Sequence, residues 1–164
     1  QQHHPDTEHP ALFKGLEDLA DKHAEAAIVL GNLYARGIGS EASPKRAVRW
    51  YKKAIKRAPM EADIVNEVAW TLTVSDIDDL RRAKYAKKIM DQLMQNSPEA
   101  RQRPEYLDTW AATHAARGMF EQATSLQKEA ISVATSQQRD DVLDILQTHL
   151  QLFESGATIT EKAP

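Results

Sequence analysis

Cysteine is absent from this sequence. Its absence excludes disulfide bonds, thiolate catalysis and zinc sites with cysteine ligands, while it leaves the cellular compartment undecided. No apolar run approaches the roughly 20 residues of a membrane-spanning helix, so we expect no transmembrane segment. A nucleotide-binding glycine loop, a His-Glu-x-x-His motif and a nucleophile elbow are also missing. We therefore predict a protein that is not an enzyme, with no catalytic residue, cofactor or metal site.

An excess of positive charge is missing as well. The chain has 21 Lys and Arg against 24 Asp and Glu, a formal net charge of -3 and a pI near 6.1. Dedicated nucleic-acid-binding domains are usually strongly basic, so nucleic acid is an unfavoured partner. With 41% hydrophobic and 27% charged residues, the 164-residue chain suits a single soluble globular domain.

Residues 1–10, QQHHPDTEHP, are polar and contain two prolines. His3, His4 and His9 could hold a metal loosely, but a metal site needs ligands in fixed positions. The composition favours a disordered N-terminal segment. The chain begins at Gln1 rather than methionine, so we expect that an upstream part was processed or cut away.

The most informative stretch is residues 24–58, which predicts two helices folded back on each other. Gly37 and Gly39 end the first helix, because glycine adopts positive φ without steric cost. Ser43 followed by Pro44 begins the second helix, as an N-cap with proline at the first helical position. Apolar and small residues follow the i, i+3, i+4, i+7 spacing of one helical face, at Ala27, Leu30, Gly31 and Tyr34 and again at Ala47, Tyr51, Ala54 and Ala58.

A family resemblance rests on this stretch. Its motif is Leu30-Gly31, Leu33-Tyr34, Gly37-x-Gly39, Ala47, Trp50-Tyr51 and Lys53-Ala54. In these positions residues 24–58 resemble a Sel-one-like repeat, a relative of the tetratricopeptide repeat. Ser40, Ser43 and Ile55 depart from the family pattern, which affects the turn and one packing position.

The second half of the chain resembles tetratricopeptide repeats. In residues 104–135 the small residues and turn glycine stand at family spacing, at Ala111, Gly118, Ala123 and Ala130, while Gln127 replaces an aromatic. Residues 60–96 match more loosely, as a helix over 60–74 and a long helix over 78–95. Gly31, Ala69 and Ala111 lie 38 and 42 residues apart, more than the 34 of a regular repeat, so we expect irregular repeats.

Further helices are predicted at both ends of this array. Residues 11–22 form an amphipathic helix that would belong to an incomplete upstream repeat, with Leu12, Leu16, Leu19 and Ala20 on its buried face. Residues 138–154 form a last helix with a broad apolar face that includes Ile145, Leu146, His149 and Phe153. We interpret this helix as a cap. Its broad face leaves open a homodimer formed through it. The tail 155–164 is expected to be loose.

The resemblance implies an all-α fold, a right-handed α-solenoid of antiparallel helix hairpins, with about eight helices and a C-terminal capping helix. Residues 11–154 would form this single repeat domain. The resemblance also implies a non-enzymatic protein-protein interaction scaffold, an adaptor or assembly factor that binds a peptide or partner protein in its concave groove. Because exported bacterial proteins often use this repeat family, we expect a periplasmic or secreted protein, with the cytoplasm as the alternative.

The family's groove positions carry over to the first helix of each pair. Asn66 can offer two donors and an acceptor to an extended backbone. Trp70 offers a large apolar surface for a partner, or alternatively packs between repeats. The acidic residues among the candidates suggest a ligand of basic character. The candidate partner-binding residues are Glu25, Asn32, Arg36, Asp63, Asn66, Trp70, Glu105, Asp108 and Ala112.

Two basic segments suggest an alternative function. The first lies in residues 45–57 and contains no acid, and the second lies in residues 81–88. Such stripes could bind nucleic acid or an anionic surface. Both fall on second helices, which form the convex outside of this kind of solenoid, so a solvated face is the favoured interpretation. A regulatory domain of a larger protein is a further alternative.

Overall fold

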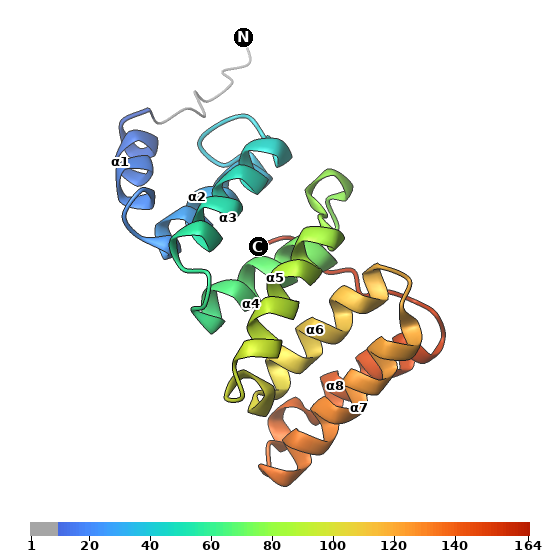
Figure 1. The fold of residues 1–164 in the computed structure, drawn as a ribbon. Helices are drawn as coiled ribbons and strands as arrows, with labels where there is room; N and C mark the ends of the chain where they lie inside the picture. The colour runs from blue at the N-terminus through green and yellow to red at the C-terminus, as the bar shows by residue number, and fades with distance from the viewer. Residues whose placement is uncertain (1–9) are drawn as a thin grey trace.

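The computed structural model describes residues 10–164, and this part of the chain is all-helical (Figure 1). The predicted all-α class is confirmed. Two short 3-10 turns, η1 (Asp78–Leu80) and η2 (Ala100–Gln102), precede α5 and α6. The eight α-helices of the described residues are α1 (Pro10–Ala20), α2 (Ala24–Arg36), α3 (Pro44–Arg57), α4 (Ala62–Val74), α5 (Ala83–Asn96), α6 (Pro104–Ala116), α7 (Phe120–Ser136) and α8 (Asp140–Glu154).

Two sequence predictions concern the N-terminal histidines and the absence of a transmembrane segment. His3, His4 and His9, considered above as loose metal ligands, lie outside the described residues. Within residues 10–164, no helix combines the length and the apolar character that crossing a membrane requires.

The hairpin of α2 and α3 begins and ends where its local chemistry predicts. Gly37 follows α2 in the left-handed conformation, with φ 71°. The Ser43 side chain accepts a hydrogen bond of 3.2 Å from the backbone N–H of Arg46. Pro44 occupies the first turn of α3, where its missing N–H costs nothing. Both boundary predictions are confirmed.

Helices that follow one another in the chain pack side by side. The adjacent pairs are α2 with α3, α4 with α5, α6 with α7, and α7 with α8 (Figure 1). A continuous hydrophobic core runs from Phe13 in α1 to Leu146 in α8. A smaller cluster joins α6 and α7 to Phe153 at the end of α8 and to Ile159 beyond it. The final residues of the chain therefore share the packed interior.

The buried face of α1 differs from the predicted one. Phe13 and Ala20 are buried, whereas Leu12 and Leu19 are 57% and 50% exposed. Phe13 packs against the ring of Tyr34, with ring centroids 5.4 Å apart. This contact turns the helix so that Phe13, rather than Leu12, faces α2.

The predicted long helix over 78–95 is interrupted. Residues 78–80 form η1, and α5 begins only at Ala83. Leu80 is fully buried, and the backbone N–H of Arg82 donates a 2.8 Å hydrogen bond to the Leu72 carbonyl. Because this bond ties the chain to α4, residues 78–82 cannot continue one straight helix.

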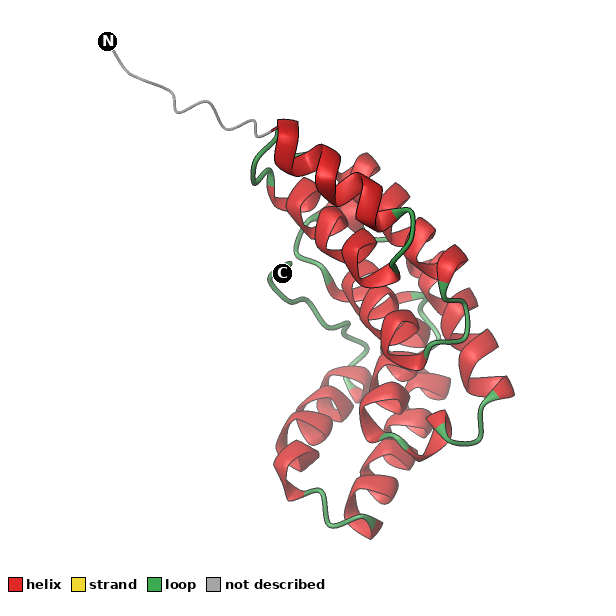
Figure 2. Cartoon of the chain, turned by 90° about the vertical axis from the view of Figure 1, so that its left-hand side faces the viewer, coloured by secondary structure: helices red, strands yellow, loops and turns green. Residues whose placement is uncertain are grey.

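The end of the chain also differs from the predicted loose tail. After α8 the chain turns at Gly156, with φ 74°. It then runs back along one side of the helix stack (Figure 2). Ile159 and Ala163 are only 8% and 3% exposed. We call residues 157–164 the C-terminal segment.

Candidate functional site

A cleft of about 410 Å³ lies between α4 and the C-terminal segment. The two walls come from parts of the chain that are far apart in sequence. Its lining residues are Asn66, Glu67, Trp70, Thr71, Val74 and Ser75 on the α4 side and Glu161, Lys162, Ala163 and Pro164 on the other.

The C-terminal segment is held by main-chain hydrogen bonds. The N–H of Glu161 donates to the Val74 carbonyl at 2.7 Å, and the N–H of Asp76 donates to the Glu161 carbonyl at 2.9 Å. These two bonds form the isolated parallel bridge between Ser75 and Glu161. The N–H of Ala163 donates to Asp76 Oδ1 at 2.9 Å. The end of α4 and the residues after it thus present an edge that pairs with an extended chain.

Side chains predicted as partner-binding residues complete this attachment. The Trp70 indole N–H donates to Glu161 Oε2 at 3.0 Å. The Trp70 and His149 rings also lie close together, with their centroids 5.8 Å apart. The Arg36 guanidinium donates from Nε to the main-chain oxygen of Pro164 at 2.6 Å. Arg36 and Trp70, from two different helices, therefore contact the same extended segment.

Alternate residues of the segment face the protein. Ile159 and Ala163 are buried, and Glu161 reaches Trp70. Thr160 and Lys162, which lie between them, are exposed, and Glu161 is exposed as well although its carboxylate reaches Trp70. This period of two is the geometry of an extended strand with one face packed.

Asn66 brings an unused polar group to the cleft. Its Oδ1 atom is buried and has no hydrogen-bond partner among the described residues. Unpaired buried polar atoms are uncommon in folded proteins and cost free energy. Beside it, burial and the neighbouring Asp63 carboxylate raise the pKa of Glu67. The cleft is therefore bordered by a buried acceptor that the C-terminal segment does not pair.

The remaining predicted residues of α2 lie apart from this cleft lining. Glu25 is exposed near the start of the helix. Asn32 Oδ1 accepts a 2.5 Å hydrogen bond from the Tyr51 hydroxyl, so it joins α2 to α3. Of the three α2 positions, Arg36 is the one that contacts the C-terminal segment.

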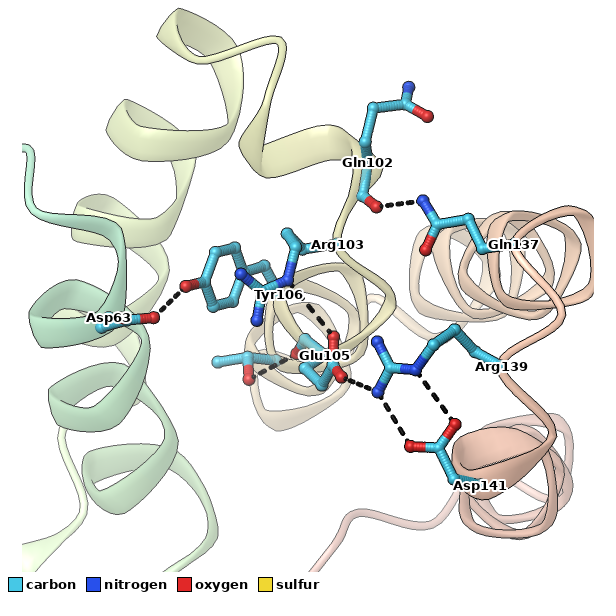
Figure 3. A network of polar contacts seen from close by, with 9 residues as sticks. Asp63, Gln102, Arg103, Glu105, Tyr106, Gln137, Arg139 and Asp141 are labelled. Carbon is cyan, nitrogen blue, oxygen red and sulfur yellow. Dashed lines mark hydrogen bonds and ion pairs between the residues drawn. The ribbon is translucent and has the colours of Figure 1, made fainter.

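Asp63 and Glu105 belong to a polar network that links α4, α6 and the start of α8 (Figure 3). Asp63 accepts from the Tyr106 hydroxyl. Burial and this bond raise the pKa of Tyr106 to about 12. Glu105 accepts from Arg139 Nη2 at 2.5 Å, and Arg139 also contacts Asp141 at 3.0 Å. Asp63 and Glu105 Oε1 are thus engaged within the chain, while Glu105 Oε2 is buried without a hydrogen-bond partner among the described residues. A ligand of basic character stays a prediction.

Asp108 and Ala112 were predicted as groove positions, and the structure places both in the interior. Asp108 is 8% exposed and accepts hydrogen bonds from Gln127 Nε2 at 2.8 Å and from His149 Nδ1 at 2.7 Å. Ala112 is 2% exposed and belongs to the cluster that contains Phe153. Because α8 covers this part of α6, neither residue can contact a partner in this arrangement.

Sequence reasoning missed the residues that pair with the C-terminal segment. Val74, Asp76 and Glu161 pair through main-chain groups, which do not depend on the residue type. The side chains of Asp76 and Glu161 add contacts to Ala163 and Trp70. The alternation of buried Ile159 and Ala163 with exposed neighbours was the one available signal, and it is short.

On α8, Leu146, His149 and Phe153 of the broad apolar face are buried while Ile145 is 50% exposed. A homodimer through α8 stays a prediction.

All the basic side chains of the α3 stripe are exposed to solvent. Among the described residues, none of its seven basic side chains forms a salt bridge. Lys53 Nζ lies 4.3 Å from the centroid of the Trp50 ring. On α5 the charges are partly engaged, since Lys87 pairs with Asp91 at 2.7 Å. The exposed α3 residues are Lys45, Arg46, Arg49, Lys52, Lys53, Lys56 and Arg57.

In the part of the chain that the structure describes, no group of three or more His, Cys, Asp or Glu side chains is placed to hold a metal ion. No family model matches the sequence, and searches of curated proteins and of solved structures give no match. The resemblance to Sel-one-like and tetratricopeptide repeats therefore stays a prediction from the residues.

Proposed function

We propose that this chain is a non-enzymatic protein-interaction scaffold, an adaptor or assembly factor that holds an extended segment of a partner protein. In this proposal the helix hairpins form a right-handed α-solenoid of the Sel-one-like and tetratricopeptide kind. The partner lies on the side formed by α2 and α4.

One observation carries the proposal: an extended segment already lies there. The chain's own residues 157–164 pair with the main chain after α4 and contact Arg36 and Trp70. Strand addition of this kind is a general mode of peptide recognition, in which main-chain hydrogen bonds give affinity and side-chain pockets give specificity. Asn66, with its unpaired Oδ1, supplies an additional contact for a bound backbone.

Site-specific photo-crosslinking tests the proposal. A photoreactive amino acid is placed at Asn66 in the cleft and, as the control, at the exposed Lys88 of α5. Both proteins are irradiated in an extract of the source organism, and the adducts are identified by mass spectrometry. We expect a protein adduct from position 66 that position 88 does not give. Adducts from position 88 alone would show that the cleft is not the working surface.

A second candidate function rests on the α3 stripe, whose seven basic side chains are exposed and free of salt bridges among the described residues. They could bind nucleic acid or another anionic surface. Phosphate binding weakens steeply as salt rises, with a slope that follows the number of phosphates neutralised. Binding to a duplex oligonucleotide at about 50 and 200 mM salt, with Arg49→Glu/Lys53→Glu as the variant, separates this function from the scaffold. Binding that is insensitive to salt and to the variant would exclude it.

A further inference from the structure

We infer that residues 157–164 are a built-in competitor, and that their pattern of an apolar, an acidic and a small residue at every second position describes the partner segment that the cleft binds. This inference rests on the proposed function and deepens it. It assigns the ligand class as an extended peptide of the form apolar-x-acid-x-small, represented in the chain by Ile159, Glu161 and Ala163.

The first position selects an apolar side chain. Ile159 is 8% exposed and lies in the cluster formed with Val74 and Phe153. Burial of such a side chain is favourable, whereas a buried polar atom without a partner is costly. The pocket therefore discriminates by hydrophobicity.

The central position selects an acid. Both main-chain groups of Glu161 are engaged by Val74 and Asp76, so its backbone is fixed in place. Its carboxylate accepts from the Trp70 indole at 3.0 Å. A donor-only indole N–H rewards an acceptor and rejects a cation. The character inferred here is opposite to the basic ligand that the sequence suggested.

The third position selects a small residue. Ala163 is 3% exposed, and its N–H is held by Asp76 Oδ1 at 2.9 Å. Because Ala163 is buried, a larger side chain would displace its neighbours, and an added carboxylate would lie close to the Asp76 carboxylate that holds the Ala163 N–H. The intervening Thr160 and Lys162 are exposed, so their side chains contribute less to this selection.

The segment is joined to α8 by a short turn. It is held by the buried side chains of Ile159 and Ala163 and by hydrogen bonds to Trp70 and Asp76. A turn at Gly156 makes it a short tether after α8. A segment on a short flexible tether competes at an effective concentration of the order of millimolar. The tethered segment therefore weakens every ligand that uses the same edge, and its release withdraws Ile159 from the cluster that contains Phe153.

The test uses the full chain with Ala163→Glu, which places a carboxylate beside Asp76 and should release the segment. Thr160→Glu is the matched control, because it introduces the same charge at an exposed position of the same segment. Amide hydrogen exchange of Asp76 and Glu161 reports release. We expect exchange at both amides to rise at least tenfold in Ala163→Glu and to stay unchanged in Thr160→Glu. Equal exchange in the two variants would overturn the inference.

Binding of a fluorescent peptide of residues 157–164 is then measured by polarisation. We expect the peptide to bind the Ala163→Glu protein at least tenfold more tightly than the wild type or Thr160→Glu. Peptides with Ile159→Ser, Glu161→Lys or Ala163→Glu should lose binding at least tenfold, while Thr160→Ala and Lys162→Ala peptides keep it. Absence of binding, or equal losses from both sets of peptides, would overturn the inference. A second full-chain variant, Glu161→Pro, removes the N–H donated to Val74 and must give the same result.

This outcome is separable from that of the proposed function. A partner crosslinked at position 66 together with no binding of the segment peptide would overturn the competitor and leave the scaffold standing. Binding of the peptide with the predicted selectivity, combined with partner adducts at position 88 alone, would support the pocket assignments and overturn the scaffold.

Discussion

Gly31 of α2 lies directly against the buried ring of Tyr51 in α3. A Cβ atom at position 31 would come within 2.6 Å of Tyr51 Cε1. The Tyr51 side chain is fully buried and its hydroxyl donates to Asn32 at 2.5 Å. The ring therefore has little freedom to move away, and glycine at this position permits the close packing of the two helices.

We predict that Gly31→Ala destabilises the protein. Overpacking a core costs about 1–3 kcal/mol, which exceeds the gain of up to about 1 kcal/mol from replacing glycine inside a helix. Gly15→Ala in α1 is the matched control, because its Cβ would meet nothing within 4 Å. Urea unfolding should show a loss for Gly31→Ala and a small gain for Gly15→Ala. A gain in both variants would contradict the packing argument.

The α2–α3 hairpin illustrates what local sequence can predict. Gly37, Ser43 and Pro44 act through their own backbone chemistry, so their effects are visible without knowledge of the rest of the fold. The face of α1 was less predictable, because Leu12 and Phe13 are adjacent apolar residues and choosing between them amounts to a rotation by one residue. The packing of Phe13 on Tyr34 decides that choice, and this contact is tertiary.

The residues predicted for the candidate site also divide into two groups, since some lie at the C-terminal segment or its cleft and others are covered by tertiary packing. Arg36, Asn66 and Trp70 were chosen from the sequence, and the structure brings them to the C-terminal segment or its cleft. Asp108 and Ala112 were chosen by the same rule and are buried under α8. Whether a helix face is open depends on what later parts of the chain cover it, which repeat spacing does not report.

The buried contact between His149 and Asp108 gives a second prediction. His149 Nδ1 lies 2.7 Å from Asp108 Oδ1, and the two side chains are 8% and 11% exposed. Removing one partner of a buried polar pair leaves the other unsatisfied, which costs about 1–3 kcal/mol or more. We expect His149→Ala to lower the free energy of unfolding by at least about 1 kcal/mol. The exposed His23 provides the control, and equal effects of His23→Ala and His149→Ala would refute a role for the pair.

The Arg139 network predicts a pH dependence. Partial burial alone would raise the pKa of Glu105, but a backbone hydrogen bond and the Arg139 guanidinium lower it overall. The hydrogen bond from Arg139 lowers the pKa of Asp141 as well. Carboxyl groups with a lowered folded-state pKa stabilise the fold above their unfolded-state pKa, and this contribution is lost as pH falls through the folded-state value.

We therefore predict that Arg139→Met destabilises the protein near pH 7 and that the difference from wild type shrinks toward pH 3. Urea unfolding at several pH values measures this difference. Arg117→Met is the control, since Arg117 is exposed and forms no salt bridge among the described residues. A difference that stays constant with pH would mean that Arg139 acts through packing rather than through the two carboxylates.

The last prediction concerns the C-terminal segment as a part of the folded core. Ile159 is 8% exposed and lies in the cluster that contains Phe153, whereas its neighbour Thr160 is exposed. Truncating a buried isoleucine to alanine costs about 2–5 kcal/mol, and because Ile159 lies at the edge of the core we expect about 2 kcal/mol. Thr160→Ala should change stability by less than about 0.5 kcal/mol. Thermal unfolding compares the two variants directly. A loose tail would make both substitutions neutral, so only a loss confined to Ile159→Ala agrees with a segment that packs through alternate residues.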